Sequence, residues 1–297
     1  MECHAAVPFV AGTFSVVYVP SGGRYLNDHT LVLGPDGTWH VYGITDESTG
    51  MPFAERQVLH AVAPGVMGPW TERSDVLVAT GDESVIWAPF AFQREQGQWT
   101  MYYWAGTDEP MLPYRRGLRR CDSVDLVTWA RRPERAVGGR DPFVLRVGGR
   151  WLLYSVDVDQ DSRGRIVVSE SDDLVQWTDP SVVITDPVPS FGWGNLESPF
   201  VVAYGGSYFL FLTRTGMSEV DYSRTLVFRS RDPLHFDWQP ITDLRAHAAE
   251  IVHLPDDEWF VTSAGWTSAV GENRGLSIAR LEWAVSACSD GGVQAAD

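Results

Sequence analysis

The chain has 297 residues, 44% of them hydrophobic and 21% charged, a balance that is typical of a globular protein with a full-sized core. Its net charge of −16 argues against nucleic acid and anionic membrane surfaces as partners. No apolar run approaches the roughly 18 residues of a membrane span, and the first residues, MECHAAVPFVAGTF, lack the features of a secretion signal. We therefore expect a cytoplasmic protein.

Five segments share one form, in which a short apolar strand, a tight turn and a second strand led by an aromatic residue follow one another. In chain order they are HTLVLGPDGTWHVYGIT, PFAFQREQGQWTMYYWAG, PFVLRVGGRWLLYSVD, PFVVAYGGSYFLFLTRT and EIVHLPDDEWFVTSAGW. Their turns suit β-hairpins. The leading aromatic residue recurs every 51 to 60 residues, at Trp39, Trp99, Trp151, Tyr208 and Trp259.

A second tryptophan marks the end of a third strand in the same frame. It stands at Trp129, Trp177 and Trp238, with Trp70 and Trp283 as its counterparts in the first and last units. These repeated tryptophans are predicted to pack between units. The four outside the repeat are candidates for a functional surface: Trp87, Trp104, Trp193 and Trp266.

Units of three or four strands, repeated five times at this period, predict an all-β fold: a five-bladed β-propeller in a single domain. A β-sandwich or a β-helix does not explain five blade-length repeats. The blades are expected at approximately 25–75, 85–132, 138–180, 193–240 and 246–285. The earlier stretch TFSVVYVP is expected to add an outer strand to the last blade and close the ring.

The first strand of each propeller blade lines the central axis, so the residues that lead into it converge on one pocket. The leading sequences are YLNDHTLV, VIWAPFAF, GGRDPFVL, GNLESPFV and RAHAAEIV. Three of them place a carboxylate at this position, at Asp28, Asp141 and Glu197, and the fifth has His247 nearby. The tripeptide RDP occurs again at Arg231–Pro233, where we expect an outer turn far from the axis.

Three carboxylates that face one cavity repel each other and lose solvation, which raises their pKa values and separates them. Glycoside hydrolysis needs this arrangement, because one carboxylic acid protonates the leaving group while another carboxylate stays ionised as base or nucleophile. The alternative is that these residues only cap loop turns.

The leading sequences resemble those of the five-bladed propeller glycosidases, glycoside hydrolase families 43, 32 and 68, over most of the chain. The motif ND at Asn27 and Asp28, RDP at Asp141 and ESP at Glu197 match the positions of that group's catalytic trio, and WAP at Trp87 is similar to family 43. The resemblance implies that Glu197 is the general acid and that Asp28 is the general base or the nucleophile. It also implies that Asp141 orients the substrate and supports the pKa of Glu197.

Further residues are candidates for substrate binding. Arg140 is suited to sugar hydroxyls, and Trp87 and Trp193 to the apolar face of a sugar ring; the others are Asn27, His29, Trp104 and Arg214. His247 matches the place where family 43 enzymes often carry a histidine near an axial metal ion, so a calcium or sodium ion is possible there, although no cofactor is required.

The sequence also departs from the pattern of these families. His29 follows Asp28 where they usually have Pro, and Ser198 stands where Gly or Cys usually follows the acid. These departures leave the substrate open; we expect a small molecule or an oligosaccharide, and a furanoside or a xyloside first. Two alternatives stay open: a carbohydrate-binding propeller without catalysis, and a non-hydrolytic acid–base enzyme that acts on a small metabolite.

Overall fold

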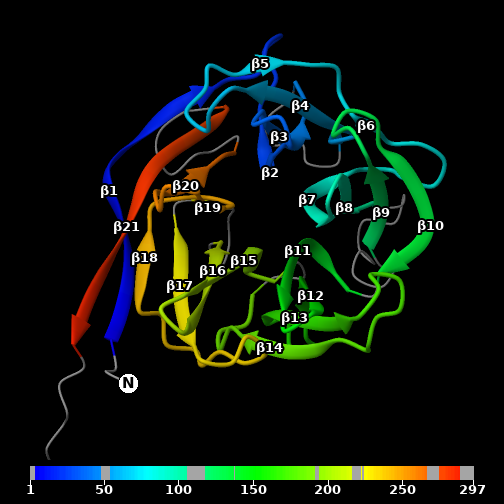
Figure 1. Cartoon of the computed structure of the whole chain (residues 1–297). Coiled ribbons are helices and arrows are strands. Elements are labelled where there is room, and N and C mark those ends of the chain that lie inside the picture. The colour runs from blue at the N-terminus through cyan, green and yellow to red at the C-terminus, as the bar shows by residue number, and fades with distance from the viewer. Residues whose placement is uncertain are drawn as a thin grey trace, which may run out of the picture.

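The computed structural model describes residues 4–47, 54–105, 118–136, 138–190, 194–215, 222, 224–265 and 274–287. Within these ranges the chain forms no α-helix, and five antiparallel sheets stand around a central axis (Figure 1). No helix in the same ranges could cross a membrane. The predicted fold, a single-domain five-bladed β-propeller, is confirmed.

Each sheet is one blade, and its strands run in order from the axis outward. The first blade consists of β2 (Asn27–Leu33), β3 (Trp39–Thr45), β4 (Gln57–Ala63), β5 (Thr71–Glu72) and β6 (Leu77–Val78). The second consists of β7 (Trp87–Glu95), β8 (Gln98–Trp104), β9 (Leu118–Ser123) and β10 (Ala130–Ala136). The third consists of β11 (Arg140–Val147), β12 (Arg150–Val158), β13 (Gly164–Ser171) and β14 (Ser181–Thr185).

The last two blades follow the same plan. The fourth consists of β15 (Leu196–Tyr204), β16 (Ser207–Arg214), β17 (Thr225–Ser230) and β18 (Thr242–Leu244). The fifth consists of β19 (Ile251–His253), β20 (Trp259–Ser263), β21 (Leu276–Ala287) and β1 (His4–Tyr18).

The fifth blade closes the ring with strands from both ends of the chain. β1 pairs antiparallel with β21, from His4 opposite Ala287 to Tyr18 opposite Leu276, and the two run side by side in Figure 1. The expected closure by an early strand is therefore confirmed. The two ends of the described chain are thereby joined in one blade, with β1 as the edge strand of that blade.

The repeated aromatic residues pack between neighbouring blades, as the sequence predicts. Trp129 meets Tyr42 edge-on at 5.5 Å between ring centres, and Trp283 stacks on Tyr204 at 4.1 Å. One detail differs from the expectation: Trp129, Trp177 and Trp238 lie in the connections between the third and fourth strands of their blades rather than at the end of a third strand. Because these packing positions recur once in each blade, the blade period is visible in the sequence.

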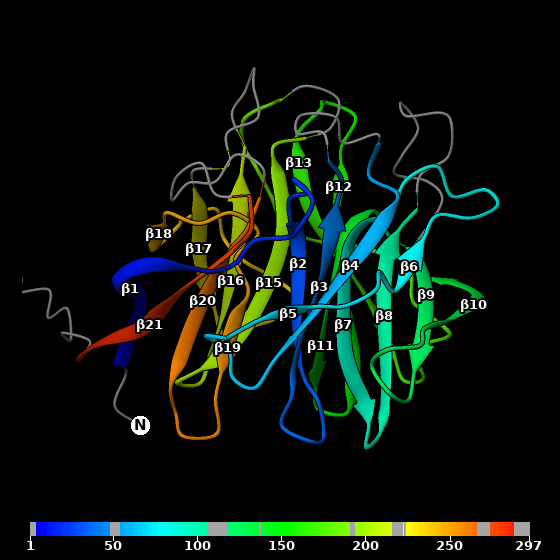
Figure 2. The same ribbon diagram turned by 90° about the horizontal axis from the view of Figure 1, so that it is seen from above.

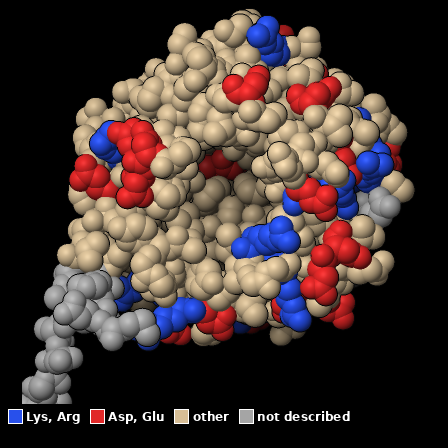
Figure 3. Space-filling model, in the orientation of Figure 1, with Lys and Arg blue, Asp and Glu red and all other residues tan. Residues whose placement is uncertain are grey.

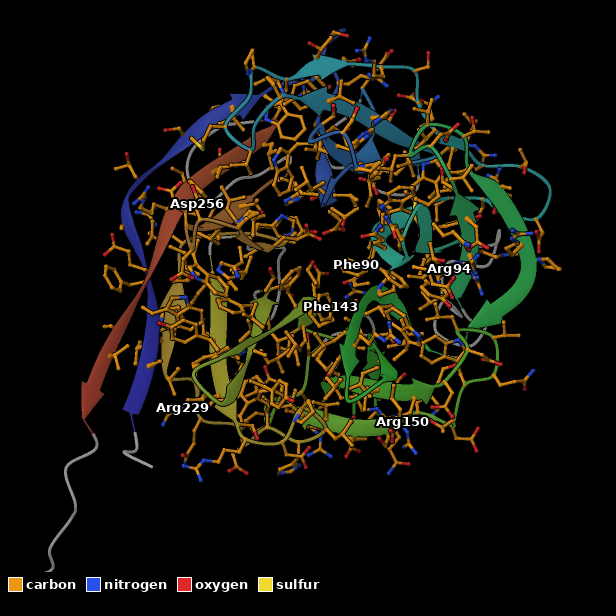
Figure 4. The ribbon with its side chains drawn as sticks, in the orientation of Figure 1. Phe90, Arg94, Phe143, Arg150, Arg229 and Asp256 are labelled. Atoms are coloured by element: carbon orange, nitrogen blue, oxygen red, sulfur yellow. The ribbon has the colours of Figure 1, made fainter. Side chains whose placement is uncertain are left out.

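The first strands of the blades begin at one face of the ring, and the hairpin tips lie at the opposite face (Figure 2). Below the strand starts, three phenylalanines fill the axis. Phe143 lies 4.9 Å from Phe90 and 4.4 Å from Phe200 between ring centres, and Figure 4 shows Phe90 and Phe143 near the middle of the ring. Two of these rings, Phe90 and Phe200, also line the axial cavity, so its wall is partly apolar.

Candidate active site

The same backbone irregularity recurs where each blade meets the axis. One residue there has a positive φ, which is a strained conformation for a residue with a side chain. These bulge residues, as we call them, are Asp28 (φ 32°), Ala88 (45°), Asp141 (54°), Ser198 (51°) and Ala248 (48°). In the first four blades the strand register shifts at this point, and all five residues line one axial cavity.

The positions of the bulge residues correct one expectation about the carboxylates. Asp28 and Asp141 are bulge residues, but Glu197 precedes the bulge residue of its blade by one position, so the three do not occupy equivalent places. The residues equivalent to Glu197 in the other blades are Asn27, Trp87, Arg140 and His247. This offset places Glu197 level with Arg140 and leaves the bulge position of the fourth blade to Ser198.

A hydrogen-bonded network joins the predicted trio. The Arg140 guanidinium donates to Oδ2 of Asp141 at 2.6 Å and to Oε1 of Glu197 at 3.1 Å. The backbone N–H of Ser198 donates to Oδ2 of Asp141 at 3.0 Å, and its hydroxyl donates to Oδ1 of Asp28 at 3.1 Å. Residues from three blades therefore meet in one polar cluster at the axis.

Burial and mutual repulsion keep protons in this cluster. Burial raises the pKa of Glu197 to about 7, although the Arg140 guanidinium opposes the rise. The pKa of Asp28 is also raised well above its usual range, first by burial and then by the charges of Asp141 and Glu197. The cluster can therefore hold a proton near neutral pH, as general acid catalysis requires.

Two residues of this site carried no signal in the sequence. The Tyr222 ring stacks on His247 at 3.7 Å, and its side chain hydrogen-bonds Glu197. Glu55 accepts a hydrogen bond from the Tyr25 hydroxyl at 2.7 Å and another from Trp87, while burial raises its pKa to about 8. Both follow second strands and lie outside the repeat, so no periodic pattern marks them.

The tryptophan and arginine candidates have separate outcomes. Trp87 and Trp104 stack on each other at 4.8 Å between ring centres, and both are buried, so neither offers an open platform in this structure. Trp193 lies outside the described residues. The Arg214 guanidinium, a candidate for substrate binding, is paired with Asp186 at 2.6 Å, outside the carboxylate cluster.

The two axial histidines are held by neighbouring groups. Nε2 of His29 hydrogen-bonds the Thr262 hydroxyl at 2.7 Å, and His29 also lines the cavity. Nδ1 of His247 donates to the Ala264 carbonyl at 2.6 Å, and its Nε2 lies 4.0 Å from Oδ1 of Asp28. Burial lowers the pKa of His247 to about 4, so the ring is neutral at physiological pH.

The described side chains do not by themselves form a metal centre. Among them, no group of three or more His, Cys, Asp or Glu residues could hold an ion. Beside His247 the described residues include Asp28, whose Oδ1 lies 4.0 Å from the His247 Nε2, and Asn27, whose buried Oδ1 has no hydrogen-bond partner among them.

The axial cavity measures about 340 Å³, including space open to solvent, and its walls combine acidic and apolar groups. Its acidic residues are Asp28, Asp141 and Glu250. Burial raises the pKa of Glu250 to about 8, and its Oε2 accepts a hydrogen bond from the Leu31 N–H at 2.9 Å. Figure 3 shows the molecule hollowed at the axis, with an acidic side chain in the depth of the hollow.

Comparisons with known proteins locate this architecture among the glycosidases. No protein-family model matches the chain, and no curated sequence matches it. Its fold is similar to that of a thermostable family-43 glycoside hydrolase, with a TM-score of 0.67, 17% identity and coverage of 91% of this chain and 95% of that one.

Two further structures have the same architecture. The GH43_1 enzyme from Xanthomonas citri in complex with xylose gives a TM-score of 0.65 at 16% identity, covering 90% of this chain and 89% of that one. The Bombyx mori GH32 β-fructofuranosidase gives 0.68 at 15% identity, covering 90% of this chain and 61% of that one. The chain therefore has the five-bladed propeller fold of glycoside hydrolases, and at these identities the likeness concerns the fold alone.

Proposed function

We propose that the protein is a glycosidase that cleaves a furanoside or a xyloside at the propeller axis. The observation that carries this proposal is the cluster of Asp28, Asp141 and Glu197, drawn from three blades and joined through Arg140 and Ser198. The partly buried Glu197 holds its proton up to a pH of about 7, which suits a general acid.

The proposed reaction uses the carboxyl groups of Glu197 and Asp28. Glu197 donates its proton to the glycosidic oxygen as the bond from that oxygen to the anomeric carbon breaks. Asp28 then acts on the other side of the sugar: either it takes a proton from a water whose oxygen bonds to the anomeric carbon, or it forms that bond itself and water later releases the sugar. The first course inverts the anomeric configuration and the second retains it.

Asp141 and Arg140 serve this chemistry without exchanging a proton with the substrate. Arg140 spans Asp141 and Glu197, so it partly neutralises a site that would otherwise hold three uncompensated carboxylates. Asp141 holds the guanidinium in place and presents an acceptor for sugar hydroxyls.

The structural neighbours support the choice of substrate class. The Xanthomonas citri GH43_1 enzyme was crystallised with xylose and with xylotriose, and another neighbour is a GH43 β-xylosidase/α-arabinofuranosidase. The Bombyx mori protein is a β-fructofuranosidase. Arabinofuranosides, xylosides and fructofuranosides are therefore the substrates to test first.

The deciding experiment is hydrolysis of a panel of aryl glycosides by the wild type and by Glu197→Gln, with the exposed Glu282→Gln as a matched control. We expect the first variant to lose on the order of 10²–10⁴-fold in kcat, most strongly with poor leaving groups, because these need the proton most. The control should keep full activity. Proton NMR of the first-formed sugar then identifies inversion or retention.

Absence of release from every glycoside by folded wild-type protein would overturn hydrolysis. Binding of a sugar without turnover would then indicate a carbohydrate-binding propeller. Conversion of another small metabolite, abolished in Glu197→Gln, would indicate non-hydrolytic acid–base chemistry at the same cluster.

A further inference from the structure

Ser198 has a place in the cluster that its type alone does not suggest. It is the bulge residue of the fourth blade and lines the axial cavity beside Asp28 and Asp141. Its hydroxyl donates to Oδ1 of Asp28 at 3.1 Å, and its backbone N–H donates to Oδ2 of Asp141 at 3.0 Å. One residue of the fourth blade thus links carboxylates from the first and third blades.

The offset of Glu197 makes this link possible. Glu197 precedes the bulge, so the bulge position of its blade is available to a small hydroxyl side chain rather than to a third carboxylate. A carboxylate there would add like charge beside Asp28 and Asp141, whereas a hydroxyl supplies a hydrogen-bond donor.

The backbone does not itself require a hydroxyl at this position. Ala88 and Ala248 occupy the equivalent places in the second and fifth blades, with φ values of 45° and 48° against 51° at Ser198. The bulge therefore forms equally well around a methyl side chain. The backbone conformation therefore does not explain the Ser198 hydroxyl, whereas the contact of this hydroxyl with Asp28 does.

The His247 ring, which lies beside Asp28, does not supply a donor to it. Nδ1 of His247 carries the proton that is donated to the Ala264 carbonyl, so Nε2 presents a lone pair 4.0 Å from Oδ1 of Asp28. An unfixed Asp carboxylate could rotate about its side-chain bonds, and a general base or nucleophile must stay within hydrogen-bonding or bonding reach of its target.

We propose that Ser198 is a positioning residue for the reaction: its hydroxyl fixes one carboxylate oxygen of Asp28, so that the other oxygen faces the reacting water or the anomeric carbon. This role rests on the proposed glycosidase function. Ser198 acts through Asp28 and exchanges no proton with the substrate.

The first test is Ser198→Ala, which should fold normally because alanine is already present at two equivalent positions. We expect kcat to fall about 3- to 15-fold, as for the loss of one hydrogen bond, while KM changes less than about twofold. Ser198→Cys, with a weaker donor of similar size, should lie between Ser198→Ala and the wild type. Thermal unfolding of each variant checks that the fold is unchanged.

A double-mutant cycle with Asp28→Ala separates positioning from a general structural effect. Azide serves as the external nucleophile: its nitrogen bonds to the anomeric carbon while the leaving oxygen departs with the proton from Glu197. In this azide-rescued background, Ser198→Ala should cause no further loss, because the side chain that it positions is absent. An equal loss in both backgrounds would overturn the proposal, as would full activity of Ser198→Ala alone.

A crystal structure of Ser198→Ala gives an answer that does not depend on activity. The proposal predicts that the Asp28 carboxylate turns away from its wild-type orientation or adopts several orientations. An unchanged, single orientation would contradict it. If the wild type hydrolyses no glycoside, the proposed function fails, and this structural comparison still decides whether Ser198 positions Asp28.

Discussion

The tripeptide Arg-Asp-Pro occurs at two places in this chain, and the two copies have different surroundings. In the first, Asp141 is buried at the axis with a φ of 54°, where it accepts hydrogen bonds from Arg140 and Ser198. In the second, Asp232 is exposed in the turn after β17 and accepts a hydrogen bond from the Leu234 N–H at 2.9 Å.

The difference shows what local sequence can specify and what it cannot. Asp before Pro stabilises a turn in many settings, because Asp binds nearby backbone N–H groups and Pro fixes its own φ. The copy at the start of a first strand is brought against Glu197 and Ser198 at the axis, whereas the second copy meets the third blade through the Pro233 carbonyl, which accepts a hydrogen bond from the Tyr154 hydroxyl at 2.8 Å. The ring, rather than the tripeptide, gives Asp141 its candidate function.

The sharpest test of this difference compares Asp141→Asn with Asp232→Asn. We expect the first to reduce kcat on the order of 100-fold or more, because it removes the charge that holds Arg140 and orients the substrate. The second should stay within about twofold of the wild type, since it changes an exposed turn. Comparable losses in steady-state assays of the two variants would refute the distinction between axis and rim.

The arginines of the two copies, Arg140 and Arg231, allow a second test through the pH profile of activity. Activity of the wild type should fall above a pH of about 7, because Glu197 then loses the proton that it must donate. Arg140 lowers the pKa of Glu197, so Arg140→Gln should move this limb to higher pH and reduce kcat about tenfold or more.

The control for the pH profile is Arg231→Gln in the second copy, which should leave the limb unchanged. The measurement is kcat/KM against pH, which reports groups of the free enzyme. A limb that stays in place in Arg140→Gln would show that another group sets it.

A smaller effect is expected on the pH dependence of stability, for Glu55 near the axis but not for Glu258 in an outer turn. Burial raises the pKa of Glu55 from 4.5 to about 8, so the folded protein keeps this proton where the unfolded chain has lost it. Its contribution is fully present below pH 4.5 and is lost as the pH rises through 8. Glu55→Gln removes the titration, so this part of the decline in unfolding free energy should disappear.

Its control is Glu258→Gln in the turn between β19 and β20, which should leave the pH dependence as in the wild type. Chemical denaturation at several pH values between 4.5 and 8 measures the difference, which we expect to be on the order of 1 kcal/mol or more for Glu55→Gln. An unchanged slope in that variant would mean that Glu55 is ionised in the folded protein.

The repeat made the fold predictable from the sequence, because each blade needs the same aromatic packing positions and tight turns. The repeat also predicted that Asp28 and Asp141 stand at equivalent places in their blades, and both are bulge residues in the structure. The one-residue offset of Glu197 can also be read from the sequence, because the shared Pro-Phe pair of WAPF, RDPF and ESPF aligns Ser198, rather than Glu197, with Asp141. The pairing of Arg214 with Asp186 depends on contacts between strands that no local motif records.

Glu55 and Tyr222 show another limit of sequence reasoning. Each follows a second strand in a connection that differs from blade to blade, so no repeat brings it into register with the axis. Their places near Glu197 follow from the curvature of the ring and from burial beside other ionisable groups. Such residues are found from three-dimensional neighbours rather than from spacing.

The closure of the fifth blade has a consequence for how the chain reaches its final form. Tyr18 pairs with Leu276, more than 250 residues later, so β1 must await its partner until nearly all the described strands have been synthesised. Until then the growing chain carries an unpaired strand at each end of an incomplete ring, which is the state most exposed to wrong pairing. Blades one to four can form in turn from local hairpins. The ring that holds the axial cluster is complete only when β1 has paired with β21.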